Sequence, residues 1–286
     1  MDLPLHIQKS IRRYEPIETE GLTLFPVLCG EWDEWLMARP ALEFLQQSLP
    51  VAFLSKPLLQ VYFELDYLPA LLGQASAASG LWDSAMMALA LALRLGSGLK
   101  PEERKYLFSP IVDRDNPAKL RAVRAVGADG KEIEITPIRF RRLRPLIAEQ
   151  NGLKLESDDA NPEMVLAERT MNGAGENLDV SFEQMVASVA ALSGMDEAEI
   201  YQWPIRKLLI RSDSILRALD YLVCGVGGAF GGFGKNGNPC PHPFFEKKKS
   251  ILDGMTELSE PNTVPDGAAK KALEAMKINM KGLSAT

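Results

Sequence analysis

The chain of 286 residues contains only two histidines and three cysteines. With His6 and His242 as its sole imidazoles, it offers almost no candidates for a catalytic system built on histidine. Cys29, Cys224 and Cys240 are odd in number and widely spaced, which does not fit the disulfide framework of a small secreted domain. We therefore expect the cysteines to be reduced.

Long apolar runs and an excess of positive charge are also missing. The longest apolar run, residues 85–93, is about half of the ~18 residues that suggest a membrane span. The first residues include an acid and a proline instead of a continuous apolar core, so we expect no secretory signal. The 32 basic and 38 acidic side chains give a formal net charge of -6, which argues against general nucleic-acid binding. These absences predict a soluble, cytoplasmic protein.

Apolar residues at helical spacing dominate the chain. They run over residues 32–45, where we expect Pro40 to kink or divide the helix, and over residues 51–72 and 81–95. The last of these segments is apolar nearly all round, which indicates a helix that is buried or covered by a partner. Helical lobes should therefore make up most of the fold.

Two stretches instead alternate between apolar and polar residues. Residues 14–27 alternate around the pair Glu20-Gly21, and residues 105–135 alternate around Asp129-Gly130. Such pairs favour the tight turn of a β-hairpin. The sequence therefore predicts an α+β fold that is mainly α, with a short N-terminal β-hairpin and a small antiparallel β insert.

Residues 180–245 join a helical hairpin to a glycine-rich turn and a proline-locked segment. Ser181 and Gln184 are spaced as a capping box, Gly194 can end that helix, and Pro204 lies near the first turn of the next. The glycine run 225–234 follows a helix and leads into prolines, so we interpret it as a hinge and not as a phosphate-binding loop. We predict a docking surface for a partner protein that includes Trp203, Phe230, Phe233, Phe244 and Phe245.

A basic helix is predicted over residues 138–149, capped by Thr136. We expect its arginines to pair with acids, either the chain's own at 156–159 and 163 or those of a partner, and so to contribute to the docking surface. A nucleic-acid patch is the alternative explanation. The arginines are Arg139, Arg141, Arg142 and Arg144.

The organisation that we expect has three parts. Residues 1–155 form an N-terminal lobe with the hairpin, helices, β insert and basic helix, and residues 156–245 form a helical-hairpin lobe with the Gly/Pro-rich docking segment. Residues 246–286 are expected to be a flexible tail with one weak helix at 268–281. Too little apolar surface remains in the tail to offset the entropy of ordering it.

No catalytic group lies at a diagnostic spacing. The carboxylate pairs in residues 113–115 and 132–134 could face a divalent metal from neighbouring strands, but the second pair is better explained as the solvent face of a hairpin. Cys240 and His242 supply only one of the two ligand pairs that a structural zinc site usually has. We therefore expect no catalytic residue, no bound metal and no cofactor.

Two stretches resemble proteins encoded among the tail genes of tailed phages. The start of tail-assembly chaperones and baseplate-hub assembly proteins is similar to Tyr14-Glu-Pro-Ile17, Gly21-Leu-Thr-Leu24 and Pro26-Val27, followed by a tryptophan-bearing helix. Their recurring C-terminal helix-turn-helix is similar to Phe182-Glu-Gln-Met-Val186, Ala190-Ala-Leu-Ser-Gly194, Ile200-Tyr201 and Trp203-Pro-Ile205. The resemblance implies a non-enzymatic protein of the host bacterial cytoplasm. It would bind other tail components, such as the tape-measure protein, and keep them soluble until assembly.

The chain also departs from the short chaperones of that family. The strand-rich insert at 105–135 and the proline-rich segment at 238–243 leave a structural tail, baseplate or neck component retained in the virion as the alternative. A metal-dependent phage enzyme is a third alternative, which rests only on the carboxylate pairs. The partners that we expect are other phage tail proteins or a second copy of the chain, with no membrane and no nucleic acid.

Overall fold

The computed structural model describes residues 3–46, 49–76, 80–127, 130–155 and 181–229. All of them belong to one compact unit. The first residues of the predicted second lobe, 156–180, its docking segment 230–245 and the tail predicted for residues 246–286 lie outside these ranges. Within the described ranges, no helix is both long and apolar enough to cross a membrane.

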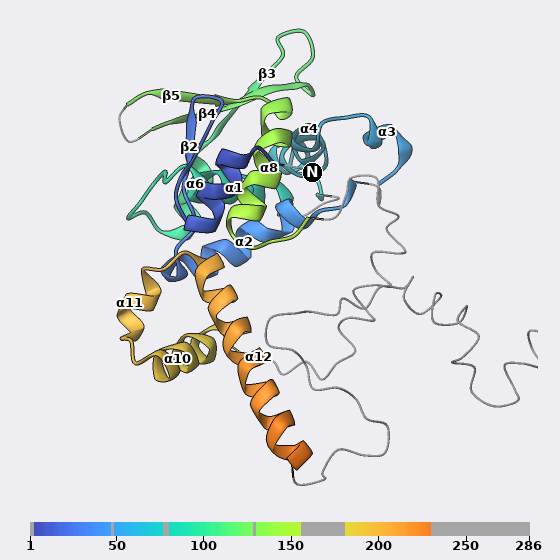
Figure 1. The fold of residues 1–286 in the computed structure, drawn as a ribbon. Coiled ribbons are helices and arrows are strands. Elements are labelled where there is room, and N and C mark those ends of the chain that lie inside the picture. Colours follow the sequence, from blue (N-terminus) through green and yellow to red (C-terminus); the bar gives the residue numbers. More distant parts are fainter. Residues whose placement is uncertain (1–2, 47–48, 77–79, 128–129, 156–180, 230–286) are drawn as a thin grey trace, which may run out of the picture. The chain divides into compact units, whose positions relative to one another are not determined.

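The fold is α+β and mainly α, as the sequence predicts (Figure 1). The helices are α1 (Leu5–Arg13), α2 (Trp32–Glu43), α3 (Val51–Leu54), α4 (Leu58–Tyr62), α5 (Leu68–Leu71), α6 (Leu81–Ala92), α7 (Pro101–Arg104), α8 (Pro137–Gln150), α10 (Phe182–Ser193), α11 (Glu197–Tyr201) and α12 (Ile205–Ala229). The strands are β1 (Ile17–Thr19), β2 (Leu22–Leu24), β3 (Ser109–Val112), β4 (Leu120–Val126) and β5 (Glu132–Ile135).

Both predicted hairpins are present. β1 and β2 pair antiparallel, and the turn between them has Glu20 at φ 48° and Gly21 at φ 73°. Two successive residues with positive φ are what the tightest hairpin turn requires, which explains the Glu-Gly pair. The second sheet has the order β3-β4-β5, again antiparallel, and Gly130 in its second turn has φ 76°. The β insert predicted within residues 105–135 is thus confirmed.

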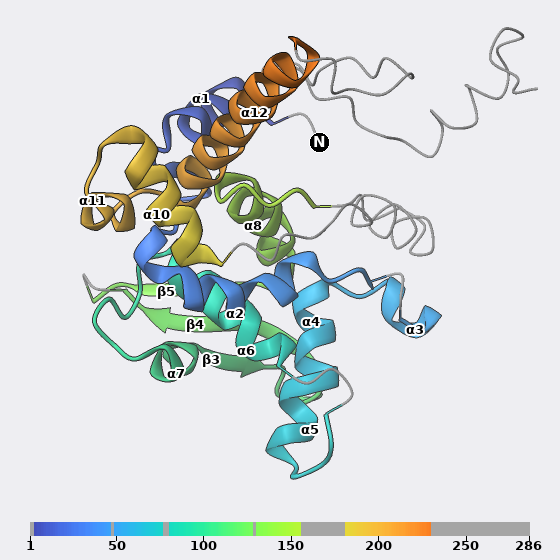
Figure 2. The same cartoon turned by 90° about the horizontal axis from the view of Figure 1, so that it is seen from below.

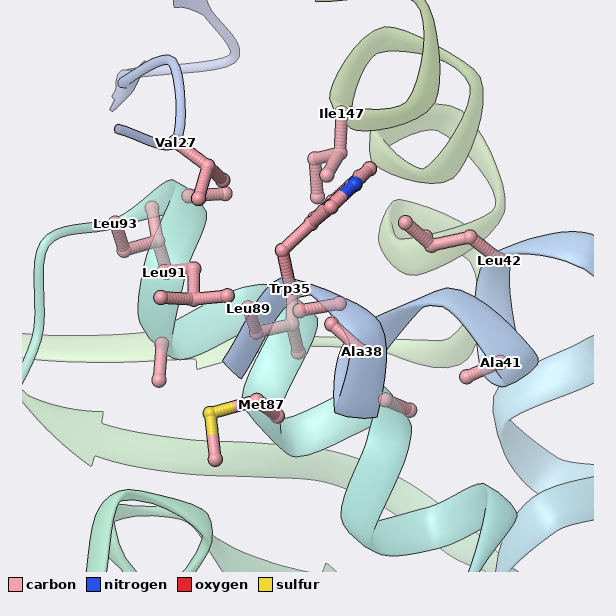
Figure 3. Packing of buried hydrophobic residues seen from close by; sticks show 14 of the residues in the cluster. Val27, Trp35, Ala38, Ala41, Leu42, Met87, Leu89, Leu91, Leu93 and Ile147 are labelled. Carbon is pink, nitrogen blue, oxygen red and sulfur yellow. The ribbon is translucent and has the colours of Figure 1, made fainter. Parts of the chain in front are cut away.

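The core is centred on α6. Every residue from 85 to 92 is at most 1% exposed, so the helix predicted to be apolar all round is buried on all sides. α2 lies beside α6 (Figure 2). Its Trp35 lies beside Ile147 of α8, with Leu89 of α6 close by (Figure 3).

Two predicted helical segments that contain a proline differ in the structure. The helix predicted over residues 51–72 is broken into α3, α4, a π-helical turn and α5, because Pro57 is in extended backbone and restarts the chain at α4. In contrast, α2 continues through Pro40 as one element. Ala38 and Ala41 on either side of this proline are fully buried, and their packing offsets the missing backbone hydrogen bond.

The C-terminal helical hairpin begins as the sequence predicts. The Ser181 hydroxyl accepts from the Gln184 amide at 3.2 Å, the Gln184 side chain accepts from the Ser181 amide at 3.1 Å, and Gly194 ends α10 with φ 69°. The first residue of α10, Phe182, stacks on Trp32 with 4.4 Å between the ring centroids. α10 is therefore joined to the start of α2 by an aromatic pair.

One cysteine expectation was wrong. Cys224 is disulfide-bonded, whereas we expected reduced cysteines throughout. Cys29 is a free and buried thiol. Burial raises the pKa of this thiol from 9.0 to about 12, although its own backbone hydrogen bond and the charge of Lys207 act in the opposite direction.

Candidate protein-binding surface

The first turn of α12 is tied to the segment that follows the N-terminal hairpin. The Cys29 amide donates to the Trp203 carbonyl at 2.7 Å, and the Ile205 amide donates to the Val27 carbonyl at 2.9 Å. Val27 is itself held from the other side, because its amide donates to the Asn151 side-chain oxygen at 2.8 Å. Backbone pairing therefore fixes where α12 starts.

One apolar stripe runs along the whole of α12. Its residues recur three or four positions apart, except that the polar Ser212 takes the position between Leu209 and Ile215, so they lie on a single face of the helix. The stripe consists of Ile205, Leu208, Leu209, Ile215, Leu216, Leu219, Leu222, Val223 and Val226.

The stripe changes its environment along the helix. Ile205 and Leu208 are fully buried, and Leu209 and Ile215 pack against the core. We call the remaining residues the distal face, and each of them is between 43% and 68% exposed. The distal face consists of Leu216, Leu219, Leu222, Val223 and Val226. A contiguous apolar face of this kind, continuing a stripe that is core elsewhere, is typical of a protein interface.

Charges of both signs flank the stripe. Asp213 and Asp220 follow one of its edges, and Arg211 follows the other. Arg217 forms a 2.8 Å ion pair with Asp213 one turn away. Ile210 is 46% exposed on the opposite side of the helix, where it is isolated from the stripe. Of these flanking charges, Asp220 lies beside the distal face itself, whereas Arg211 and Asp213 precede it.

The four arginines of α8 that were predicted as docking residues have different environments in the structure. Arg142 pairs with Glu20 in the turn of the first hairpin, at 2.8 Å. Arg139 lies 3.5 Å from the same carboxylate and also donates to the Glu134 carbonyl at 2.8 Å. Arg141 is exposed. The acids that the sequence suggested as partners, at 156–159 and 163, lie outside the described residues.

Arg144 and Trp203 are interior residues, which corrects their assignment to a docking surface. Arg144 is 8% exposed and donates from Nε to the Leu42 carbonyl and from Nη2 to the Phe44 carbonyl, each at 2.8 Å. It thereby closes the end of α2. Trp203 is also 8% exposed, and the Lys207 ammonium lies 3.7 Å from the centroid of its ring. The other predicted docking residues, Phe230, Phe233, Phe244 and Phe245, lie outside the described residues.

The predicted carboxylate pairs have structural partners. Arg124 lies 2.9 Å from Glu134 and 3.7 Å from Glu132 across the β4–β5 ladder, as expected for the solvent face of a hairpin. Asp113 accepts from the Asp115 amide at 3.1 Å, which shapes a turn. Among the residues that the structure describes, no three histidine, cysteine or carboxylate side chains gather as a metal site. Cys240 and His242 are not among those residues.

A cavity of about 1030 Å³ lies beside α4 and the start of α8. Its buried Gln60 accepts from the Leu120 amide at 2.7 Å and donates to the Ala118 carbonyl at 2.8 Å. Lys56 and Glu64 at its wall form a 2.5 Å ion pair. These polar groups serve to hold the loop before β4, so we do not assign chemistry to this cavity.

The residues of the distal face were not among the docking residues predicted from the sequence. The stripe itself could be found, because its helical spacing is visible in the sequence. The point at which it emerges from the core could not, since that depends on how far α10 and the N-terminal elements reach along α12. No family model, no curated protein and no solved structure matches this chain.

Proposed function

We propose that this chain is a non-enzymatic protein-binding protein of tailed-phage tail assembly, and that its distal face holds an apolar helical segment of another tail component. The observation that carries the proposal is the apolar stripe of α12, which is core over its first turns and exposed from Leu216 onward. The resemblance of residues 14–27 and 182–205 to tail-assembly chaperones and baseplate-hub assembly proteins supplies the biological setting.

The shape of the face favours a helix as its occupant. Five side chains repeat over residues 216–226, a length of about 15 Å along the axis. A partner helix with apolar residues at i, i+3, i+4 and i+7 fits such a stripe side by side. The tape-measure protein, which is long and helical, is the partner that the resemblance implies.

The size of the face favours reversible binding. Covering five side chains that are about half exposed contributes on the order of 1 kcal/mol each, and the partner contributes a similar amount. Association itself costs roughly 4–15 kcal/mol in lost freedom of motion. The net free energy of binding is therefore small, and the complex is weak and can dissociate. An assembly chaperone requires such reversible binding.

Co-expression tests the function. A tailed-phage tape-measure protein co-expressed with this chain is expected to remain in the soluble fraction when the wild-type chain is present, and to be lost from it when Leu219 and Leu222 are both replaced by Asp. If the tape-measure protein has the same solubility with the wild-type chain, with the double variant and with no chain at all, the chaperone function is excluded.

The protein content of purified phage particles distinguishes an assembly chaperone from a component of the virion. We expect this polypeptide to be absent from purified particles, since a chaperone leaves before assembly is complete. Detection of the chain in stoichiometric amounts would instead assign it to the tail, baseplate or neck structure.

A further inference from the structure

We infer that the cavity between α1, α8 and the first turn of α12 binds an aliphatic carboxylate, which is a single carboxylate group on a branched apolar body. Free aliphatic acids have this chemistry, and so does the C-terminus of a polypeptide that ends in a leucine. The inference does not rest on the proposed function, because the cavity lies at the first turn of α12 and the distal face begins only at Leu216.

The cavity has the volume and the apolar lining of a small-molecule site. Its volume is about 440 Å³, and such sites usually have roughly 300–1,000 Å³. Figure 2 shows the three helices that contribute to it, α1, α8 and α12, next to one another. Among the residues that the structure describes, the apolar side chains of the lining are aliphatic, which suits a branched aliphatic group. These residues are Leu3, Ile11, Pro145, Leu153 and Leu155.

Arg206 and Glu149 form a polar pair in the wall of the cavity. The Arg206 Nη1 donates to the Glu149 carbonyl and lies 3.1 Å from the Glu149 carboxylate, which weakens the repulsion between that carboxylate and an anion. The Arg206 Nε is buried and has no hydrogen-bond partner within the described ranges, which is unfavourable for a charged donor. A negative charge in the cavity attracts the guanidinium and so reduces this penalty.

Arg12 provides the positive charge that the pair of Arg206 and Glu149 does not neutralise. Its side chain is exposed, and its Nη2 donates only one long hydrogen bond, to the Gln8 side-chain oxygen at 3.4 Å. The Gln8 side-chain amide in turn donates to the Leu3 carbonyl at 2.7 Å, so Gln8 is held in place beside the cavity. Because a guanidinium binds a carboxylate through two parallel hydrogen bonds, Arg12 is the residue that holds the charged group of the ligand.

The charges of the lining favour a ligand with one negative charge. Arg12 and Arg206 against Glu149 leave one excess positive charge. A carboxylate matches this charge, whereas a phosphate group carries about two negative charges at pH 7. The aliphatic side chains of the lining contribute only if the ligand also has an apolar body that they can cover. These two requirements together define the aliphatic carboxylate.

Amide NMR titrations of the isotope-labelled full-length protein test the inference. The probes are the dipeptide N-acetyl-leucyl-leucine, its C-terminal amide, isocaproate and acetate, each at millimolar concentration. We expect saturable shifts of the Gln8, Leu153 and Arg206 amides with the dipeptide. The amide of the dipeptide lacks the charge and should bind about tenfold more weakly or worse. Acetate lacks the apolar body and should not saturate the site.

Two variants of α1 separate the cavity from the general charge of the helix. Arg12→Gln removes the charge that lines the cavity, and Arg13→Gln removes the neighbouring charge, whose residue does not line it. We expect the dipeptide to bind Arg12→Gln about tenfold more weakly and Arg13→Gln as it binds the wild type. Both arginines are exposed, and far-ultraviolet circular dichroism verifies that the variants keep the fold.

Equal binding of the dipeptide and its amide, or equal binding to the wild type and Arg12→Gln, would overturn the inference. Saturation by acetate would overturn it as well, and so would the absence of shifts with both the dipeptide and isocaproate. Binding of isocaproate identifies a free aliphatic acid as a ligand, whereas binding of the dipeptide alone identifies a polypeptide C-terminus. None of these results bears on the distal face, which the co-expression experiment tests separately.

Discussion

The Ile205 amide donates to the Val27 carbonyl at 2.9 Å and so joins the start of α12 to the segment after the first hairpin. This hydrogen bond lies at the first turn of α12, and the distal face lies toward the other end of the same helix. The first turn of α12 is held by backbone hydrogen bonds and by the buried side chains of Ile205 and Leu208. The effects of substitutions on the distal face can therefore be distinguished from the effects of substitutions that destabilise the fold.

The two halves of the α12 stripe should respond differently to truncation. Leu208→Ala removes a fully buried side chain and is expected to lower the free energy of unfolding by about 2–5 kcal/mol. Leu222→Ala changes a side chain that is 59% exposed and should cost less than about 1 kcal/mol. Urea unfolding followed by circular dichroism measures both. Comparable losses would mean that the distal face is part of the core.

Arg144 should matter for stability and Arg142 should not. Arg144→Ala leaves the buried carbonyls of Leu42 and Phe44 without their donor, and each such group costs about 1–3 kcal/mol. Arg142→Ala breaks an ion pair whose arginine is 68% exposed, and should change the free energy of unfolding by less than about 1 kcal/mol. Thermal and urea melts of the two variants check this contrast. A stable Arg144→Ala protein would refute the interior role.

The buried thiol of Cys29 should make stability depend on pH in the alkaline range. The pKa of this thiol is about 12 in the folded chain and 9.0 without burial. Because the folded value is the higher one, the contribution of the thiol is complete below about pH 9 and is lost as the pH rises toward 12. The advantage in unfolding free energy of the wild type over Cys29→Ala should therefore shrink between pH 8 and pH 11. An advantage that stays constant over this range would show that the thiol ionises without hindrance.

Local chemistry explains the parts of the fold that the sequence predicted. The capping box at Ser181, the Glu20-Gly21 turn and the Thr136 cap, whose hydroxyl accepts from the Arg139 amide at 3.2 Å, each depend on residues within a few positions of one another. The same rule could have found α11, because Asp196 caps it by accepting from the Ala198 amide at 3.0 Å.

Distant contacts explain what the sequence missed. The positions of the arginines on α8 suggested a surface stripe, yet Arg144 bonds to carbonyls about a hundred residues earlier in the chain. Pro40 was expected to kink or divide its helix, but the helix is not divided, because packing on both sides of the proline maintains α2 as one element. The distal face has the same origin, since spacing reveals the stripe of α12 but not the residue at which its neighbours stop covering it.

The central claim is that the distal face of α12 binds a helix of a tail component. The most direct measurement is capture of the co-expressed tape-measure protein, per folded molecule, by the wild type, by Leu219→Asp with Leu222→Asp, and by Ile210→Asp as a control on the opposite side of the same helix. Removal of central apolar anchors typically costs about 2 kcal/mol or more, so we predict at least a roughly 30-fold loss of binding for the double variant and wild-type binding for the control. Equal capture by all three proteins, with their helical content intact, would contradict the account.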